Sequence, residues 1–277
     1  IEISREAFKD RRALEYIKLP ESLEVIGLES FRGCTNLKEM YIPENTVRIG
    51  ESAFRDCTDM KKLKIKNNCI KIGERAFEDC VSLVSINIPK NVTTIGEGAF
   101  DGCKALKSID ITEENQHYAS IDGLLYSKDL TKIERAIAGV KQKTYSIPAS
   151  VTTIGKSAFA SCSVLRKVTF KGTAVTIIGT GCFKDCKKLT AINLQKLTAL
   201  TAISDNCFSG CKELKKITIP SGVKTIGKKA FYGSSKLKTV TFKSTKIKKV
   251  GSKAFCKIIP DILGGDEEYC NIMHADG

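Results

Sequence analysis

The apolar residues of this chain recur in a fixed order at intervals of about two dozen residues. An aliphatic residue stands five positions before each repeated phenylalanine, and further apolar residues follow it, as Leu37, Met40 and Ile42 follow Phe31. Such self-similarity predicts a solenoid of stacked coils. The repeated residues are Phe8, Phe31, Phe54, Phe77, Phe100, Phe159, Phe183, Phe208, Phe231 and Phe255.

Within one repeat, the pattern predicts a short strand followed by a turn. The strand segment alternates apolar and polar residues, as in the Ile217-Thr218-Ile219 stretch, and alternation with period two is typical of a strand buried on one side. Proline often follows and ends the strand, since it cannot donate to a ladder. Gly or Ser stands four residues before each phenylalanine and would cap a short helical turn. We therefore expect a parallel sheet backed by short helical turns.

One interval is longer than the others and interrupts the pattern. Phe100 and Phe159 are 59 residues apart, and Asp122-Gly123 between them is a strong signal for a two-residue hairpin turn. We expect one solenoid over residues 1–258, with an irregular repeat and a hairpin insertion at 112–146, and a tail or weak cap at 259–277. The chain opens with Ile1 instead of methionine, so we also expect it to be a trimmed piece.

The net charge of +14 is concentrated in the later repeats. Residues 1–150 hold 23 basic and 23 acidic side chains, whereas residues 151–260 hold 22 basic and 3 acidic ones. Lysine supplies all but one of those 22, and it acts as a point charge, so reading of nucleic-acid sequence is not expected. A polyanion is therefore one alternative partner, and the other interpretation of these lysines is simple solubility.

The twelve cysteines follow the repeat as well. Seven stand three residues after a repeated phenylalanine, and in stacked coils their side chains would point the same way, which disfavours disulfides. We expect buried free thiols, and we interpret the two C-x3-C pairs as small-residue positions rather than a zinc site. Cys69, Cys256 and Cys270 fall outside the ladder, and we expect Cys270 to be the most exposed.

The sequence contains few residues and no motif typical of catalytic sites. His117 and His274 are the only histidines, and no nucleophile elbow or zinc-binding helix motif occurs. No apolar run approaches the roughly 20 residues that a membrane span needs. We therefore predict a protein that is not an enzyme and needs neither a cofactor nor a metal.

The polar residues that alternate with the buried strand positions are the candidate binding residues. They would line the open side of the sheet, a surface that solenoids commonly use for binding. The alternative is that they are only solvated. The residues singled out are Tyr16, Tyr41, Lys62, Lys64, Asn87, Lys216 and Thr218.

These repeats resemble the BspA-like leucine-rich repeat proteins of bacterial and protozoan surfaces, over nearly all of residues 1–258. The resemblance implies an α/β right-handed horseshoe with a parallel sheet on the concave face and helical or irregular turns on the convex face. It also implies a surface or secreted adhesion module whose partner is a protein or glycan on a host or neighbouring cell. The buried asparagine that follows the strand in ordinary leucine-rich repeats is absent, so no asparagine ladder is expected. A structural spacer that displays another domain is a further alternative.

Overall fold

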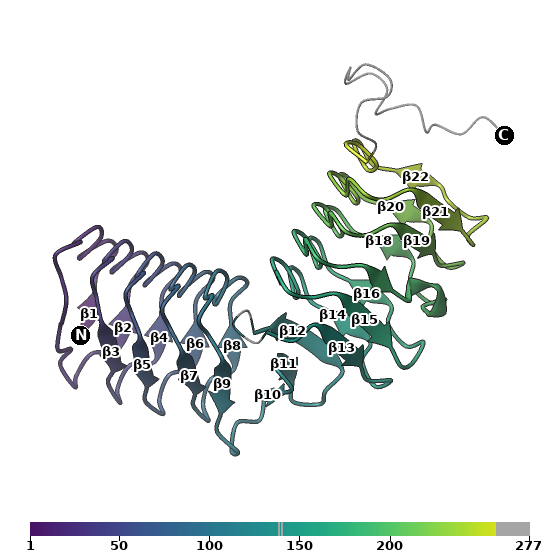
Figure 1. Cartoon of the computed structure of the whole chain (residues 1–277). Helices are drawn as coiled ribbons and strands as arrows, with labels where there is room; N and C mark the ends of the chain where they lie inside the picture. Colours follow the sequence, from purple (N-terminus) through teal and green to yellow (C-terminus); the bar gives the residue numbers. More distant parts are fainter. Residues whose placement is uncertain (138, 140, 259–277) are drawn as a thin grey trace. The chain divides into compact units, whose positions relative to one another are not determined.

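A computed structural model describes residues 1–137, 139 and 141–258 of the chain. The chain forms two compact units (Figure 1). Unit 1 comprises Ile1–Lys128 and Ile137–Val140, and unit 2 comprises Asp129–Ala136 and the chain from Lys141 onward. Each unit is a stack of coils, and most coils contribute one longer and one shorter strand.

Unit 1 carries two parallel sheets on different sides of its coils. The longer strands pair in the order β3-β5-β7-β9, and the shorter ones pair in the order β1-β2-β4-β6-β8. The alternation of apolar and polar residues predicts only the longer strands. Their bounds are β3 (Glu39–Ile42), β5 (Lys62–Ile65), β7 (Ser85–Ile88) and β9 (Ser108–Ile111). The shorter strands are β1 (Glu2–Ile3), β2 (Val25–Ile26), β4 (Arg48–Ile49), β6 (Lys71–Ile72) and β8 (Thr94–Ile95).

Unit 2 repeats this plan with more interruptions. The strands on the side of the coil that carries the longer strands in unit 1 form the ladders β13-β15-β17 and β19-β21, and those on the other side form β12-β14-β16 and β18-β20-β22. The strands on the longer side are β13 (Thr144–Ile147), β15 (Lys167–Phe170), β17 (Ala191–Ile192), β19 (Lys216–Ile219) and β21 (Thr239–Phe242). The others are β12 (Lys132–Ala136), β14 (Thr153–Ile154), β16 (Ile177–Ile178), β18 (Ala202–Ile203), β20 (Thr225–Ile226) and β22 (Lys249–Val250).

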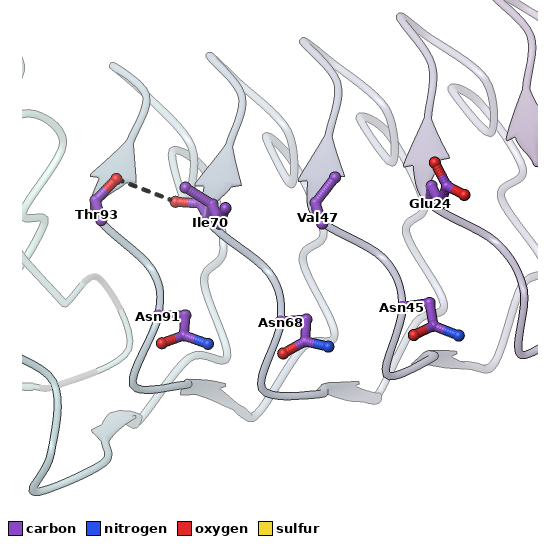
Figure 2. Close-up of a pocket in the computed structure, with 7 residues that line it drawn as sticks. All are labelled: Glu24, Asn45, Val47, Asn68, Ile70, Asn91 and Thr93. Carbon is purple, nitrogen blue, oxygen red and sulfur yellow. Dashed lines mark hydrogen bonds between the residues drawn. The ribbon is translucent and has the colours of Figure 1, made fainter.

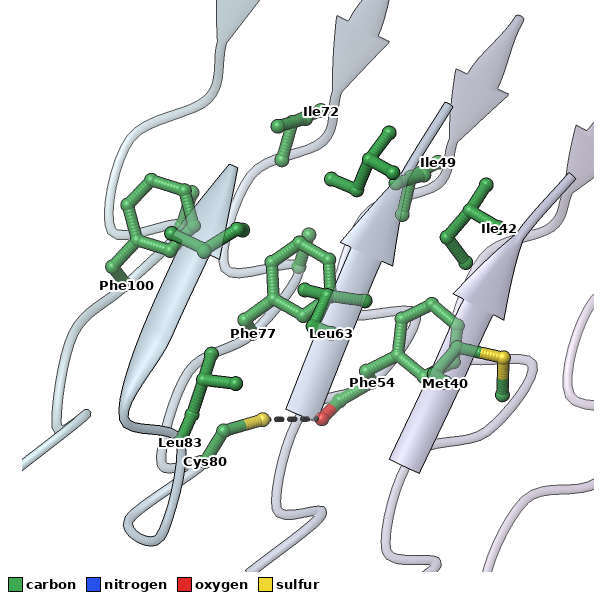
Figure 3. Packing of buried hydrophobic residues seen from close by; sticks show 14 of the residues in the cluster. Met40, Ile42, Ile49, Phe54, Leu63, Ile72, Phe77, Cys80, Leu83 and Phe100 are labelled. Carbon is green, nitrogen blue, oxygen red and sulfur yellow. Dashed lines mark hydrogen bonds between the residues drawn. The ribbon is translucent and has the colours of Figure 1, made fainter. Parts of the chain in front are cut away.

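The repeated phenylalanines form a continuous stack inside each unit. Figure 3 shows Phe54, Phe77 and Phe100 of unit 1. In unit 1 the ring centroids of successive residues lie 5.0 to 6.0 Å apart with nearly parallel planes. In unit 2 the distances are 5.2 to 5.4 Å, and Tyr145 closes the stack with an edge contact to Phe159. Most of these rings are fully buried, so the in-register stacking predicted from the sequence is confirmed.

The turns around the phenylalanines are not helical, which differs from the helical turn expected there. Residues two before and two after each phenylalanine have positive φ, for example Glu29 at 52° and Gly33 at 73°. These left-handed residues direct alternate N–H groups out of the coil. The Phe31 N–H donates to the Ala53 carbonyl of the next coil at 2.8 Å. Every second N–H group of the turn therefore donates to the next coil, so a continuous ladder of helical hydrogen bonds cannot form within the turn. The one helix in the described chain is a 3-10 turn, η1 (Leu194–Lys196).

Glycine precedes eight of the ten turns, at a position where neighbouring coils pack closely, and Ser4 and Ser204 take this position in the other two. A Cβ atom on Gly73 would lie 2.5 Å from the carbonyl carbon of Gly50, and one on Gly50 would lie 2.6 Å from that of Gly27. None of these three glycines has positive φ. The position therefore selects glycine for space and not for conformation, and it is not a helix cap.

The long interval contains a hairpin that covers the last coil of unit 1. β10 (Tyr118–Ile121) pairs antiparallel with β11 (Leu124–Ser127), and the turn residues Asp122 and Gly123 both have positive φ, as a tight hairpin requires. The buried Asn115 amide donates to the carbonyls of Pro89 and Val92, at 2.8 and 3.1 Å. These contacts attach the start of the insertion to the last regular coil of unit 1.

A parallel-strand solenoid is thus confirmed, with turns in place of helices. The horseshoe curvature and the division into a solenoid at 1–258 with an insertion at 112–146 stay predictions. The expected weak cap at 259–277 and the expected exposed thiol of Cys270 lie outside the described residues.

Candidate interaction surfaces

Five of the seven candidate binding residues lie in unit 1. Tyr41, Lys62, Lys64 and Asn87 project from β3, β5 and β7, while Tyr16 lies one coil before β3. The Lys38 N–H donates to the Glu15 carbonyl at 3.0 Å, which aligns the coil of Tyr16 with that of β3. Lys216 and Thr218 lie on β19 of unit 2, beside Thr239 and Thr241 of β21. The structure therefore divides the predicted set between the two units.

The tyrosines are among the most exposed large side chains of unit 1. Tyr16 is 63% exposed and Tyr41 is 56% exposed. Tyr41 is directly opposite Lys64 in the parallel ladder, and Glu39 is opposite Lys62. We call Tyr16, Tyr41, Lys62 and Lys64 the tyrosine face. It combines two aromatic side chains with two lysines; Tyr41, Lys62 and Lys64 lie on the paired strands β3 and β5, and Tyr16 lies on the preceding coil.

Asn87 has a structural role that its position in the outward row does not reveal. Its side-chain oxygen accepts a hydrogen bond from the Ile65 N–H at 2.9 Å, and its amide donates to the Ile65 carbonyl at 2.7 Å. The side chain thus replaces the backbone bonds where the β5–β7 ladder stops at Leu63 and Ile86. Asn193 of unit 2 does the same for Phe170, at 2.7 and 3.2 Å. Asn87 is therefore a bridge between coils first, and its role in binding a ligand stays a prediction.

A shallow hollow runs along the short-strand side of unit 1 (Figure 2). It is built from equivalent positions of successive coils, so that exposed Asn45, Asn68 and Asn91 stand in one row. Val47 and Ile70 stand in the next row and are 37% and 47% exposed. The sequence pattern singles out none of these positions except Asn91, which begins an Asn-Val-Thr glycosylation acceptor that matters only in a eukaryotic secretory route.

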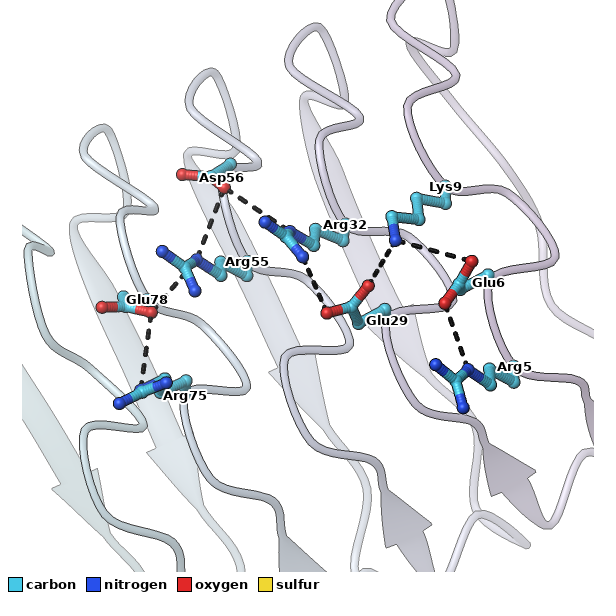
Figure 4. A network of polar contacts seen from close by, with 9 residues as sticks. All are labelled: Arg5, Glu6, Lys9, Glu29, Arg32, Arg55, Asp56, Arg75 and Glu78. Carbon is cyan, nitrogen blue, oxygen red and sulfur yellow. Dashed lines mark hydrogen bonds and ion pairs between the residues drawn. The ribbon is translucent and has the colours of Figure 1, made fainter.

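The turns of unit 1 carry a chain of alternating charges (Figure 4). Glu29 lies at its centre, 2.6 Å from the Lys9 ammonium and 2.7 Å from the Arg32 guanidinium. The hydrogen bond from Lys9 and the charge of Arg32 lower the pKa of Glu29, so its carboxylate is held ionised. One coil further along, the Arg55 Nε atom lies 3.1 Å from Glu78 of the following coil. The contacts are within the molecule and neutralise this surface locally.

The cysteine ladder is structural. The Cys57, Cys80 and Cys103 thiols each donate to the carbonyl of the repeated phenylalanine one coil earlier, at 3.1 to 3.2 Å. Burial raises the pKa of the Cys80 thiol well above its usual range, so the reactive thiolate is disfavoured. Cys256, outside the ladder, is disulfide-bonded. Among the described residues no group of three or more His, Cys, Asp or Glu side chains could hold a metal ion.

Comparison with known proteins identifies the family of these repeats. The family model of the BspA type leucine rich repeat region matches residues 1–122 and 132–259 in six copies. No curated protein matches the chain. The described part of the chain contains no helix able to cross a bilayer.

Several solved structures are similar to the chain. The pneumococcal vaccine antigen PcpA is 28% identical with a TM-score of 0.82, over 93% of this chain and 64% of that one. A leucine rich cell surface protein from Faecalibacterium prausnitzii is 29% identical with a TM-score of 0.71, over 88% and 70% of the two chains. A leucine-rich repeat protein from Bacteroides ovatus is 25% identical with a TM-score of 0.56, over 93% and 74%. The chain thus spans less than two thirds of PcpA. Because the family model matches nearly all of the described residues, the chain belongs to the family of BspA type leucine rich repeat proteins.

Proposed function

We propose that this chain is a non-enzymatic binding module of a cell-surface or secreted protein, and that it binds a protein partner through the tyrosine face. The surface location is supported by relatives such as the cell surface protein of Faecalibacterium prausnitzii. Leucine-rich repeat domains of this family typically serve as protein-binding scaffolds.

The exposure of Tyr16 and Tyr41 carries the proposal. Tyrosine offers a large contact area for few rotatable bonds, and it is enriched at the centres of protein interfaces. Both side chains project from coils whose backbone is already ordered, so binding loses little conformational entropy. Glu39 and the lysines of β5 would add charge complementarity around the aromatic contacts.

The test is capture of partners from extracellular and cell-surface extracts on the immobilised chain, followed by an affinity measurement with each purified candidate. The double variant Tyr16→Ser/Tyr41→Ser is expected to weaken the binding of a true partner at least about tenfold. Ile177→Ser is the matched control, because Ile177 is 55% exposed and lies in unit 2. Equal loss with the control, or no loss with the double variant, would refute this face as the binding site. A chain that retains no protein at all would favour a structural spacer.

A further inference from the structure

Unit 2 carries a concentrated group of cations that the tyrosine face does not use. The cations lie between each turn and the strand that follows it. They occupy positions four, five, seven or eight residues after the repeated phenylalanine. Four consecutive coils contribute, from Phe159 to Phe231. We call this group the basic face; it consists of Arg166, Lys167, Lys187, Lys188, Lys212, Lys215, Lys216, Lys236 and Lys238.

The coil stacking brings these nine side chains onto one surface. The Thr190 N–H donates to the Arg166 carbonyl at 2.9 Å, and the Lys238 N–H donates to the Lys215 carbonyl at the same distance. These bonds hold the first coil in register with the second, and the third with the fourth, about 4.8 Å apart. At the turns, the Asp185 N–H donates to the Ser209 carbonyl at 2.7 Å and joins the second coil to the third. All nine side chains are exposed. The arrangement is an array of cationic groups carried on two ladders, β13-β15-β17 and β19-β21.

Very little negative charge balances the array. Glu213 is the one acidic residue at these positions in the four coils, and it lies 2.6 Å from Lys236. The hydrogen bond from Lys236 lowers the pKa of Glu213, and the charges of Lys215 and Arg166 lower it further, which shows how these cations converge. Among the described residues, no other member of the basic face is in a salt bridge.

Unit 1 uses the same positions differently. There they hold cations together with Glu15, Glu39 and Asp59, and Lys38 is paired with Asp59 at 2.7 Å. The excess of cations is thus a property of unit 2 and does not follow from the repeat. Like charges on neighbouring coils repel each other, so the uncompensated array lowers the stability of the folded protein. A bound polyanion would relieve this repulsion.

We propose that the basic face of unit 2 binds a linear sulfated glycan. An extended polyanion would lay its charges along successive coils and release the repulsion between the lysines. Eight of the nine cations are lysines, which act as point charges and suit an irregular row of sulfates. The neighbouring strands offer the hydroxyls of Thr169, Thr218 and Thr239 to sugar hydroxyl groups.

A nucleic acid fits this surface less well. Proteins that hold single strands stack the bases on aromatic side chains, and base readout in duplexes relies on bidentate arginine. The four positions that make the basic face contain no aromatic residue in any of the four coils. A glycan presents sulfates and hydroxyls without bases, which matches the chemistry available.

The experiment titrates a heparin oligosaccharide into the full chain at several salt concentrations. We expect binding at low salt whose affinity falls linearly on a log–log plot against salt, as counterion release requires. Lys212→Ala/Lys215→Ala should weaken binding about tenfold or more. The matched control is Lys104→Ala/Lys107→Ala, which removes the same charge at the same two positions of a unit 1 coil. It should change the affinity less than about twofold. Thermal melting checks that each variant is folded.

Three results would overturn the proposal. They are no binding to heparin at low salt, equal weakening by the unit 1 control, and equal or tighter binding of a DNA duplex matched in charge. Desulfated heparin should not bind. Tyr16→Ser/Tyr41→Ser should keep full affinity for heparin, so the two binding hypotheses fail independently.

Discussion

The two units share one core plan but differ in how their polar positions are used. Phe54 and Phe208 lie in equivalent stacks with ring spacings within the same narrow range. On the turns of unit 1, opposite charges alternate and pair, as around Glu29. On the coils of unit 2, lysines gather with few acidic partners. The comparison teaches that the apolar positions determine the solenoid, and that the polar positions can acquire separate binding properties on the same scaffold.

The largest expected effect tests whether the two cores are equivalent. Phe77→Ala in unit 1 and Phe208→Ala in unit 2 each remove a fully buried ring that stacks on both sides. Each should lower the free energy of unfolding by about 3–5 kcal/mol, because the rigid coils leave a cavity. Chemical denaturation followed by circular dichroism measures it. A variant that unfolds like the parent protein would show that its stack contributes no stability.

The same glycine-to-alanine substitution should lower stability more where the coils pack closely, at Gly73 of unit 1, than at Gly155 of unit 2. Gly73→Ala places a methyl group 2.5 Å from the backbone of Gly50, so coils must separate, at a cost of about 2–3 kcal/mol. Gly155→Ala in unit 2 meets its nearest atom, the Ile133 carbonyl oxygen, at 3.0 Å. There we expect less than about 1 kcal/mol, since the alanine also restricts the unfolded chain. Equal melting temperatures of the two variants would contradict the coil packing described for unit 1.

The thiol ladder makes stability fall at alkaline pH. Burial raises the pKa of Cys80, so the native thiol keeps its proton where the unfolded one loses it, above about pH 8.5. The stabilisation is complete below that pH and declines as the pH rises. Cys80→Ser should reduce this decline by about 1.4 kcal/mol per pH unit, measured by denaturation between about pH 9 and 10.

A serine in unit 2 supplies the reference for that variant. The Ser234 hydroxyl occupies the equivalent position and donates to the Phe208 carbonyl at 2.7 Å. Cys80→Ser at neutral pH should therefore change the free energy of unfolding by less than about 1 kcal/mol, whereas Cys80→Ala loses the donor. Serine performing worse than alanine would refute this role for the ladder.

The smallest effect concerns the ion pairs of unit 1. Glu29→Gln removes the carboxylate that Lys9 and Arg32 share, and it should cost about 1 kcal/mol or less at low salt. The lowered pKa of Glu29 means that this contribution is present above the pKa of the unfolded carboxyl and is lost as the pH falls through the native value. Denaturation should be measured at about 0.1 M and about 1 M salt, between which the Debye length falls from about 10 Å to about 3 Å. The difference in free energy of unfolding between Glu29→Gln and the parent protein should shrink at the higher salt concentration. A loss of stability that does not depend on salt would contradict an electrostatic role for Glu29 and indicate that its side chain contributes by packing.

The stacking could be predicted from the sequence because each apolar position recurs. The Phe31–Phe54 contact follows from an interval that keeps the register, and Asp122-Gly123 has residue types that a tight turn requires. The left-handed turns were missed because ordinary residues such as Glu29 and Arg75 adopt positive φ there. A signal was nevertheless present: two residues after each phenylalanine the chain often has Gly or Asp, types that tolerate this conformation.

The binding surfaces could be predicted only in part. The outward strand positions follow from the period of two, and the exposure of Tyr41 agrees with it. The bridging role of Asn87 depends on where one ladder stops, which no local pattern encodes. The basic face likewise needs the coils to be stacked, since its lysines are far apart along the chain.

The hydrogen bonds from each turn to the next coil make the two sides of a coil mutually complementary. The donor that Phe31 offers to Ala53 is the same kind of donor that Phe54 offers to Ala76. A duplicated coil can therefore be inserted by recombination without a new interface having to evolve. Array length, and with it the reach of the protein, can drift between related genes while the joint between neighbours stays unchanged.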